Sequence, residues 1–208
     1  MKKLYLLRHG QTEFNVKKLV QGRCDSPLTD LGRKQAGMAA AWLKANGVVP
    51  DKVVSSPLGR AMATASLVAT ELLGADADVE PCEGIIERCY GTFEEGPHDA
   101  LPTDVWDPGE DLIPFGGEGS HALQERMVDT LTNIMGADGI ETLLAVSHGS
   151  ASRQFIKAAA PEGFELPAKL SNCAIMIFDF DEAKPQAEGE PMQCKFTLQQ
   201  IVDPQQSN

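Results

Sequence analysis

The sequence predicts an α/β protein, a three-layer αβα sandwich with a mostly parallel central sheet. Short apolar runs typical of buried strands alternate with helical segments of ten or more residues, which is the pattern of a parallel sheet covered by helices. The 208 residues suit one large domain or two small ones. No internal repeat or linker divides them, so we expect a single domain over residues 1–203, followed by a frayed tail at 204–208.

The first half of the chain alternates strand and helix twice. Residues 3–7 (KLYLL) form a short apolar run, and irregular sequence follows it. Helical spacing then begins in TDLGRKQAGMAAAWLKANG, with Thr29 as the expected N-cap and Gly47 as the stop. The run DKVVSS predicts a second strand. SPLGRAMATASLVATELLG predicts a second helix, with Ser56 as N-cap and Gly74 at its end.

The second half begins with an irregular segment at about residues 91–119, where prolines and glycines interrupt any period. Long irregular segments in compact domains are typically functional loops or disorder, so this is the expected lid or specificity segment. HALQERMVDTLTNIMG resumes helical spacing, ETLLAVS predicts a third strand, and HGSASRQFIKAAA predicts a short helix ended by Pro161. NCAIMIFDF and KFTLQQIV predict two closing strands joined by a polar loop.

Charge and cysteine content exclude several function classes. The net charge of −12 disfavours nucleic acid and anionic membranes as partners. The five cysteines are scattered without a CxxC pair, which predicts free thiols in a reducing cytoplasm and no zinc site. The apolar run near the N-terminus is too short for a secretory signal, and no stretch is long enough to cross a membrane. We expect a cytoplasmic protein, and no oligomeric state is indicated.

Polar residues follow the predicted strands where each strand ends. The sequences are LLRHG, VVSSPLGR and AVSHG. Ligands of open α/β sheets bind outside these carboxyl ends. Arg60, in the first turn of a helix, opposes the helix dipole unless an anion lies nearby. Together with Arg8, His9 and His148, it predicts an anion site.

Taken in order, these motifs resemble the histidine phosphatase superfamily, also called the phosphoglycerate mutase-like family. The resemblance covers nearly the whole chain. It is carried by LLRHGQTEFN, GRCDSPLTDLGRKQA, SSPLGRAMATA, ERCYGTFEEG and SHG. It implies a phosphoglycerate mutase-like fold, a small-molecule phosphate ester as substrate, and phosphoryl transfer through a phosphohistidine. It implies no metal and no other cofactor.

The resemblance also implies five catalytic residues. His9 attacks phosphorus from one ring nitrogen while the other donates to a backbone carbonyl. Arg8 and Arg60 direct paired N–H groups at phosphate oxygens. His148, as an imidazolium beside the phosphate dianion, stabilises charge on the equatorial oxygens. Glu87 protonates the leaving alkoxide and then takes a proton from the attacking water.

Several of these residues also belong to the implied substrate site, namely Arg8, Arg60, Glu87 and His148. Asn15 is expected to bond the transferred phosphate, and Gln21 and Gly22 match a position at the rim. Gly149, in the SHG motif, completes the set, and Ser150 has helix-start amides that could touch phosphate.

Residues outside the motifs are expected to be structural. His98 and His121 predict exposed loop or cap histidines, and Trp42 predicts a packing residue. Trp106 is also assigned to packing, with the substrate mouth as the alternative. Arg126 is expected to tie the irregular segment to the core.

The choice of reaction depends on residues 89–125, which contain nine acids and no Lys or Arg. Mutases of the family carry a cationic insertion here, and an acidic segment repels a bisphosphate. We therefore expect a phosphatase acting on a small phosphomonoester with little negative charge beyond the phosphate. The alternatives are a cofactor-dependent phosphoglycerate mutase and a non-catalytic phosphate-binding module.

Overall fold

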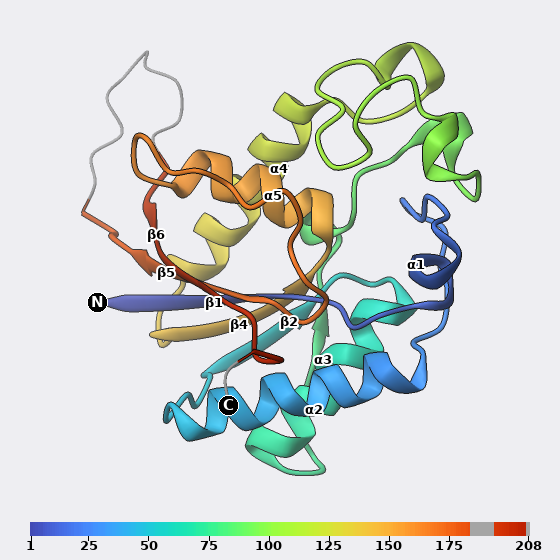
Figure 1. Cartoon of the computed structure of the whole chain (residues 1–208). Coiled ribbons are helices and arrows are strands. Elements are labelled where there is room, and N and C mark those ends of the chain that lie inside the picture. Colours follow the sequence, from blue (N-terminus) through green and yellow to red (C-terminus); the bar gives the residue numbers. More distant parts are fainter. Residues whose placement is uncertain (184–193, 207–208) are drawn as a thin grey trace.

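The computed structural model, which describes residues 1–183 and 194–206, is built on a six-stranded sheet (Figure 1). The strand order is β3-β2-β4-β1-β5-β6. The first four strands in that order are parallel, and β5 pairs antiparallel with both β1 and β6. The strands are β1 (Lys2–Arg8), β2 (Lys52–Ser55), β3 (Glu80–Pro81), β4 (Thr142–Ser147), β5 (Ile175–Phe180) and β6 (Phe196–Val202).

Helices cover both faces of this sheet, which confirms the three-layer α/β fold. In Figure 1, α2 (Asp30–Ala45) and α3 (Gly59–Leu73) lie below the sheet, and α4 (Ser120–Met135) and α5 (Gly149–Ala159) lie above it. Each layer has its own apolar core. Leu7 packs with the α2 and α3 side, whereas Leu4 and Leu6 pack with the α4 and α5 side. Side chains on a strand alternate between its faces, so β1 supplies both cores.

The predicted helix ends are partly right. Thr29 is the N-cap of α2, accepting from the Gly32 amide at 3.0 Å, and Gly74 caps α3. Ser56 does not cap α3: the helix begins at Gly59, and Leu58 is its N-cap. The Ser56 hydroxyl instead accepts from the Leu58 amide at 3.4 Å, in the turn that precedes the helix.

The segment at 91–119 is irregular, as predicted, and it has a small core of its own. Three short 3-10 helices interrupt it: η2 (Gly91–Phe93), η3 (His98–Ala100) and η4 (Ile113–Phe115). In this core, Leu101 and Leu112 of the segment pack with Val20 and Tyr90, and Phe93 and Val105 lie against them. A further 3-10 helix, η1 (Glu83–Ile85), precedes the segment, and a short helix, α1 (Glu13–Lys17), lies in the stretch after β1.

The chain ends differ from expectation. Gln205 Nε2 donates to the Asn172 carbonyl oxygen at 3.0 Å, so the expected tail is anchored at this point. Most of the polar loop expected between β5 and β6, and residues 207–208, lie outside the described residues.

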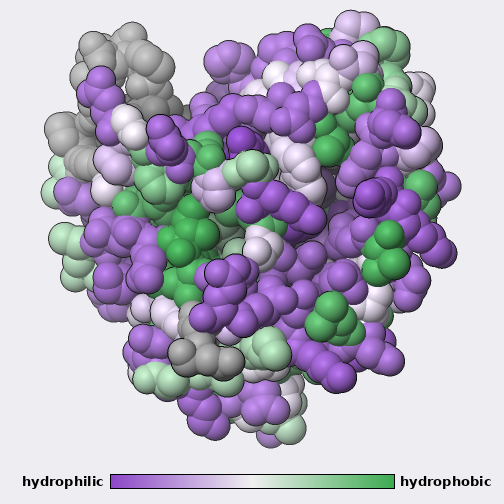
Figure 2. All heavy atoms as spheres, viewed as in Figure 1, coloured by the Kyte–Doolittle hydropathy of each residue, from purple (hydrophilic) through white to green (hydrophobic). Residues whose placement is uncertain are grey.

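Hydrophilic side chains cover most of the face in Figure 2. Within the described ranges, no helix has the length and apolar character needed to span a membrane.

Candidate active site

A cavity of about 40 Å³ lies beyond the carboxyl ends of β1, β2 and β4. Backbone pairing explains its position, because Arg8 is opposite Ser147 in the sheet and Ser55 is opposite Val146. The residues that follow these strands are therefore brought together. The cavity has room for a few water-sized groups, such as a phosphoryl group. Its walls are Arg8, His9, Asn15, Leu19, Val20, Gln21, Gly22, Arg60, Glu87, Tyr90, His98, Val105 and Trp106.

His9 is buried and its ring is fixed by a backbone hydrogen bond. Nδ1 lies 2.7 Å from the carbonyl oxygen of Gly10. A carbonyl can only accept, so Nδ1 carries the hydrogen and Nε2 keeps its lone pair. Burial, followed by the charges of Arg60 and Arg8, holds the pKa of His9 well below 6.5. The imidazole is therefore neutral, with the nitrogen arrangement that the sequence predicted for a nucleophile.

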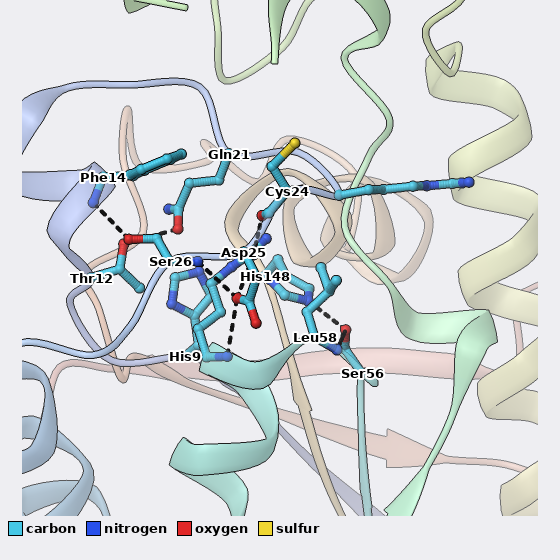
Figure 3. A network of polar contacts seen from close by, with 12 residues as sticks. His9, Thr12, Phe14, Gln21, Cys24, Asp25, Ser26, Ser56, Leu58 and His148 are labelled. Carbon is cyan, nitrogen blue, oxygen red and sulfur yellow. Dashed lines mark hydrogen bonds and ion pairs between the residues drawn. The ribbon is translucent and has the colours of Figure 1, made fainter. Parts of the chain in front are cut away.

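His148 lies beside His9, with 5.1 Å between the ring centres. Its Nε2 is 2.7 Å from Ser56 Oγ (Figure 3), and its buried Nδ1 has no partner within the described residues. Burial, then Arg60 and His9, hold the pKa of His148 well below 6.5. Burial and the two guanidinium groups therefore favour a neutral imidazole, whereas the imidazolium was expected beside a phosphate dianion.

Arg8 and Arg60 supply those positive charges. Arg8 donates from Nη1 to the carbonyl of Leu170, and its Cζ lies 5.3 Å from the ring centre of Trp106. Arg60 donates to the carbonyls of Gly22 and Cys24, both at 2.7 Å. Burial lowers the pKa of Arg8 to about 10, against an opposing effect of Glu87, so it stays charged at neutral pH. Neither buried Nε has a partner within the described chain, which leaves donors for an anion.

Arg60 also forms an ion pair with Asp25, whose Oδ1 lies 3.2 Å from Nη1. Figure 3 shows Asp25 and Cys24 on the segment that passes over the start of α3. This segment holds the Arg60 guanidinium in a fixed direction, because carbonyl and carboxylate oxygens accept from both of its terminal nitrogens.

Glu87 lies in the cavity wall with 8% of its surface exposed. Its carboxylate accepts from the amides of Ser150 and Ala151, at the first turn of α5, and from the amide of Arg88. These bonds fix the carboxyl group beside the cavity. Two acids lie close by in the sequence: Glu94 accepts from the amides of Arg23, Cys24 and Tyr90, and neither Glu94 nor Glu95 lines the cavity.

Three further predicted residues line the cavity, namely Asn15, Gln21 and Gly22. Gly22 has φ +52°, and a Cβ there would collide with the Glu94 side chain, so glycine is required at this turn. Gly149 lies behind the cavity: a Cβ at this position would come within 3.0 Å of the Trp106 ring and 3.3 Å of Arg8 Nε.

The structure does not bring Ser150 to the cavity as expected. Its amide is taken by Glu87, and its hydroxyl accepts from Arg88 Nε at 2.9 Å. Arg88 is itself fully buried and joins α5 to the irregular segment by donating to the carbonyls of Gly109 and Glu118 and to the hydroxyl of Ser120. Arg126 ties the same segment to the core, as predicted, through Glu118.

Two aromatic residues of the irregular segment line the cavity. Trp106 is at the mouth, which was the alternative assignment, and His98 is half-buried rather than exposed. The segment is held down at Val105, whose carbonyl accepts from the Tyr90 hydroxyl at 2.7 Å. At Asp107 it is held by Gln154 and Lys157 of α5. His121 is exposed, as expected.

The acids of residues 89–125 are not directed at the cavity: within the described chain, none of the nine lines it. Several are occupied elsewhere, with Glu94 accepting from amides, Glu118 pairing with Arg126 and Asp107 pairing with Lys157. The three that are engaged contribute less negative charge to the site than a count of acids suggests, and whether the segment repels anions stays a prediction.

Sequence reasoning missed the loop at 160–174, which carries none of the motifs. Asn172 Nδ2 donates to the His9 carbonyl oxygen at 3.1 Å and to Asn15 Oδ1 at 3.2 Å, and the Leu170 carbonyl accepts from Arg8. This loop therefore closes one side of the site. No group of His, Cys, Asp and Glu side chains in residues 1–183 and 194–206 is arranged to hold a metal ion.

Comparison with known proteins agrees with this arrangement. A probable phosphoglycerate mutase of Cronobacter sakazakii is 32% identical over 91% of this chain and 90% of that protein. A broad-specificity phosphatase of Saccharomyces cerevisiae is 31% identical over 74% and 69%. The structure of a phosphoserine phosphatase mutant of Entamoeba histolytica in complex with phosphoserine superposes with TM-score 0.72, 27% identity, and coverage of 99% and 98%. The sequence model of the histidine phosphatase superfamily (branch 1) matches residues 4–190, and the chain belongs to that family.

Proposed function

We propose that this protein is a metal-independent phosphatase that hydrolyses a small phosphomonoester through a phosphohistidine on His9. The observation that carries the proposal is the orientation of His9. Its Nδ1 hydrogen is held by the Gly10 carbonyl, so the Nε2 lone pair is available beside two buried guanidinium groups. Superfamily members are phosphatases or mutases, so an enzyme is expected of this chain.

In the first step, Nε2 of His9 attacks phosphorus and the bond to the ester oxygen breaks. Arg8 and Arg60 bind the phosphate oxygens, which lowers the cost of gathering negative charge in a buried site. Glu87, in its protonated form, gives its proton to the leaving alkoxide. The alcohol leaves, and the phosphoryl group stays on His9.

In the second step, water attacks the phosphohistidine and Glu87 takes a proton from that water. The N–P bond breaks, and inorganic phosphate and free His9 are released. His148 supports both steps as a neutral donor: if the Ser56 hydroxyl donates to Nε2, the imidazole proton lies on the unpartnered Nδ1. Ser56 is in this account a positioning residue.

A phosphatase is favoured over a mutase because residues 89–125 supply no Lys or Arg to the site. The relatives do not separate the two reactions, since one is named a probable phosphoglycerate mutase and another a broad-specificity phosphatase. A mutase must also hold a bisphosphate, and residues 89–125 add no cationic donor to Arg8 and Arg60.

The test is a panel of phosphomonoesters assayed with EDTA, comparing the wild type with His9→Ala and His121→Ala. We expect EDTA-resistant hydrolysis, lost in His9→Ala and kept in His121→Ala, which removes an exposed imidazole. An acid-labile phosphoenzyme should form in the wild type and in His121→Ala, but not in His9→Ala. Activity that survives His9→Ala, or disappears with EDTA, contradicts the mechanism. A coupled assay primed with 2,3-bisphosphoglycerate detects the mutase reaction.

A further inference from the structure

Lys169 lies at the mouth of the cavity although it is absent from every motif. Its Nζ is 5.6 Å from the ring centre of Trp106, the same ring that faces Arg8. The adjoining residue, Leu170, accepts a hydrogen bond from Arg8, which fixes this part of the chain against the site. Lys169 is thus a third cation beside the cavity, and it comes from the loop at 160–174 rather than from residues 89–125.

This ammonium group is exposed and has no anionic partner among the described residues. The other cations near the irregular segment are already engaged: Lys157 pairs with Asp107, and Arg126 pairs with Glu118. Partial burial and then the charge of Arg8 lower the pKa of Lys169, as expected when two like charges lie close together. An anion bound between them would relieve that repulsion.

The geometry also gives the direction in which a substrate extends. The phosphoryl group belongs at the inner end, where Arg8, Arg60 and His9 converge. The alcohol half has to leave past Leu19, Val105 and Trp106, which carry no charge. Lys169 lies on the Trp106 side of these walls, with Nζ 5.6 Å from the ring centre.

We propose that Lys169 binds a carboxylate on the alcohol half of the substrate and makes the enzyme selective for carboxylated phosphomonoesters. The inference rests on the proposed phosphatase function. A single ammonium matches a monoanion, whereas a second phosphate would call for the paired guanidinium donors found at the inner end of the cavity. The acidic segment predicted a substrate with little negative charge beyond its phosphate. Lys169 instead predicts a substrate that carries a single further negative charge.

The experiment uses two substrate pairs that differ in the carboxylate. One pair is phosphoserine and phosphoethanolamine, and the other is 3-phosphoglycerate and glycerol 3-phosphate. We expect the wild type to prefer the carboxylated member of each pair. In Lys169→Ala, kcat/KM for the carboxylated members should fall about tenfold or more, and kcat/KM for the others should stay within about twofold. Lys169→Arg should keep the preference.

Lys44→Ala is the matched control, because it removes the same charge from the exposed end of α2. Equal losses on both members of a pair would mean that Lys169 only supports Trp106, and would overturn the proposal. So would a wild type without carboxylate preference. If the wild type hydrolyses neither these esters nor p-nitrophenyl phosphate, the proposed function fails. Calorimetry with His9→Ala, with and without Lys169→Ala, then tests Lys169 by the affinity difference between phosphoserine and phosphoethanolamine.

Discussion

Replacing Ser56 with alanine tests whether this residue sets the tautomer of His148. Both side chains are fully buried, and the hydroxyl lies 2.7 Å from Nε2. Removing it leaves a buried nitrogen without a partner, which costs about 1–3 kcal/mol. We therefore expect the free energy of unfolding to fall by that amount in urea titrations.

The effect on rate has a separate cause. If the Ser56 hydroxyl donates to Nε2 in the wild type, the hydrogen stays on Nδ1, where it can bond a phosphate oxygen. In Ser56→Ala the hydrogen is free to move to Nε2, and a fraction of molecules loses this donor. Loss of one preorganised donor costs about 10²–10³ in rate, so a partial loss predicts a fall in kcat of about 10- to 100-fold.

Ser55→Ala is the matched control for this prediction. Ser55 is equally buried, and its hydroxyl donates to the Ser56 carbonyl at 2.9 Å rather than to His148. It should lose comparable stability and keep kcat within about twofold. Initial rates with saturating p-nitrophenyl phosphate measure both variants. Wild-type kcat in Ser56→Ala, or an equal loss in Ser55→Ala, would refute the tautomer argument.

Three other predictions concern stability and the contacts that hold residues 91–119 beside the cavity. The pKa values of His9 and His148 are held below 6.5, so the unfolded chain binds protons that the folded chain does not. The free energy of unfolding should therefore fall as pH drops below about 6.5, by about 1.4 kcal/mol per pH unit for each histidine. In denaturant titrations at several pH values, the unfolding free energy of His148→Gln should change less with pH than that of the wild type. Arg88→Met leaves several buried acceptors unpaired and should cost about 3 kcal/mol or more, lowering the melting temperature by roughly 10 °C; a change of under about 2 °C would contradict this. Asp107→Asn removes a partly exposed ion pair with α5 and should cost less than about 1 kcal/mol, yet acrylamide should quench Trp106 more strongly once the other tryptophan is changed to phenylalanine. Unchanged quenching would show that this ion pair does not hold the mouth closed.

The sequence by itself determined the layers and the centre of the site. Alternating apolar periods placed β1, β2 and β4 in one sheet, and the carboxyl ends of parallel neighbours have to meet at one edge. Arg8 ends β1, His9 follows it and His148 follows β4, so their proximity needed no tertiary information. Glu87 was found through its motif.

Helix starts were less predictable where two local preferences compete. Thr29 caps α2 as expected. Its hydroxyl also donates to Gln11, in the segment after β1, and this bond does not compete with capping. Ser56 has the same capping potential, but the following proline keeps it extended and His148 lies within reach of its hydroxyl. That second partner is 92 residues away, and a capping rule contains only local information.

The electrostatic character of the mouth was decided by the tertiary structure alone. A count of nine acids gave the sign of residues 89–125, but it did not show that Glu118 and Asp107 pair with cations or that none of the nine lines the cavity. Lys169 and Asn172 entered the site from a loop without any motif. Charge and hydrogen-bond partners depend on distances in space, and the packing of distant segments sets those distances.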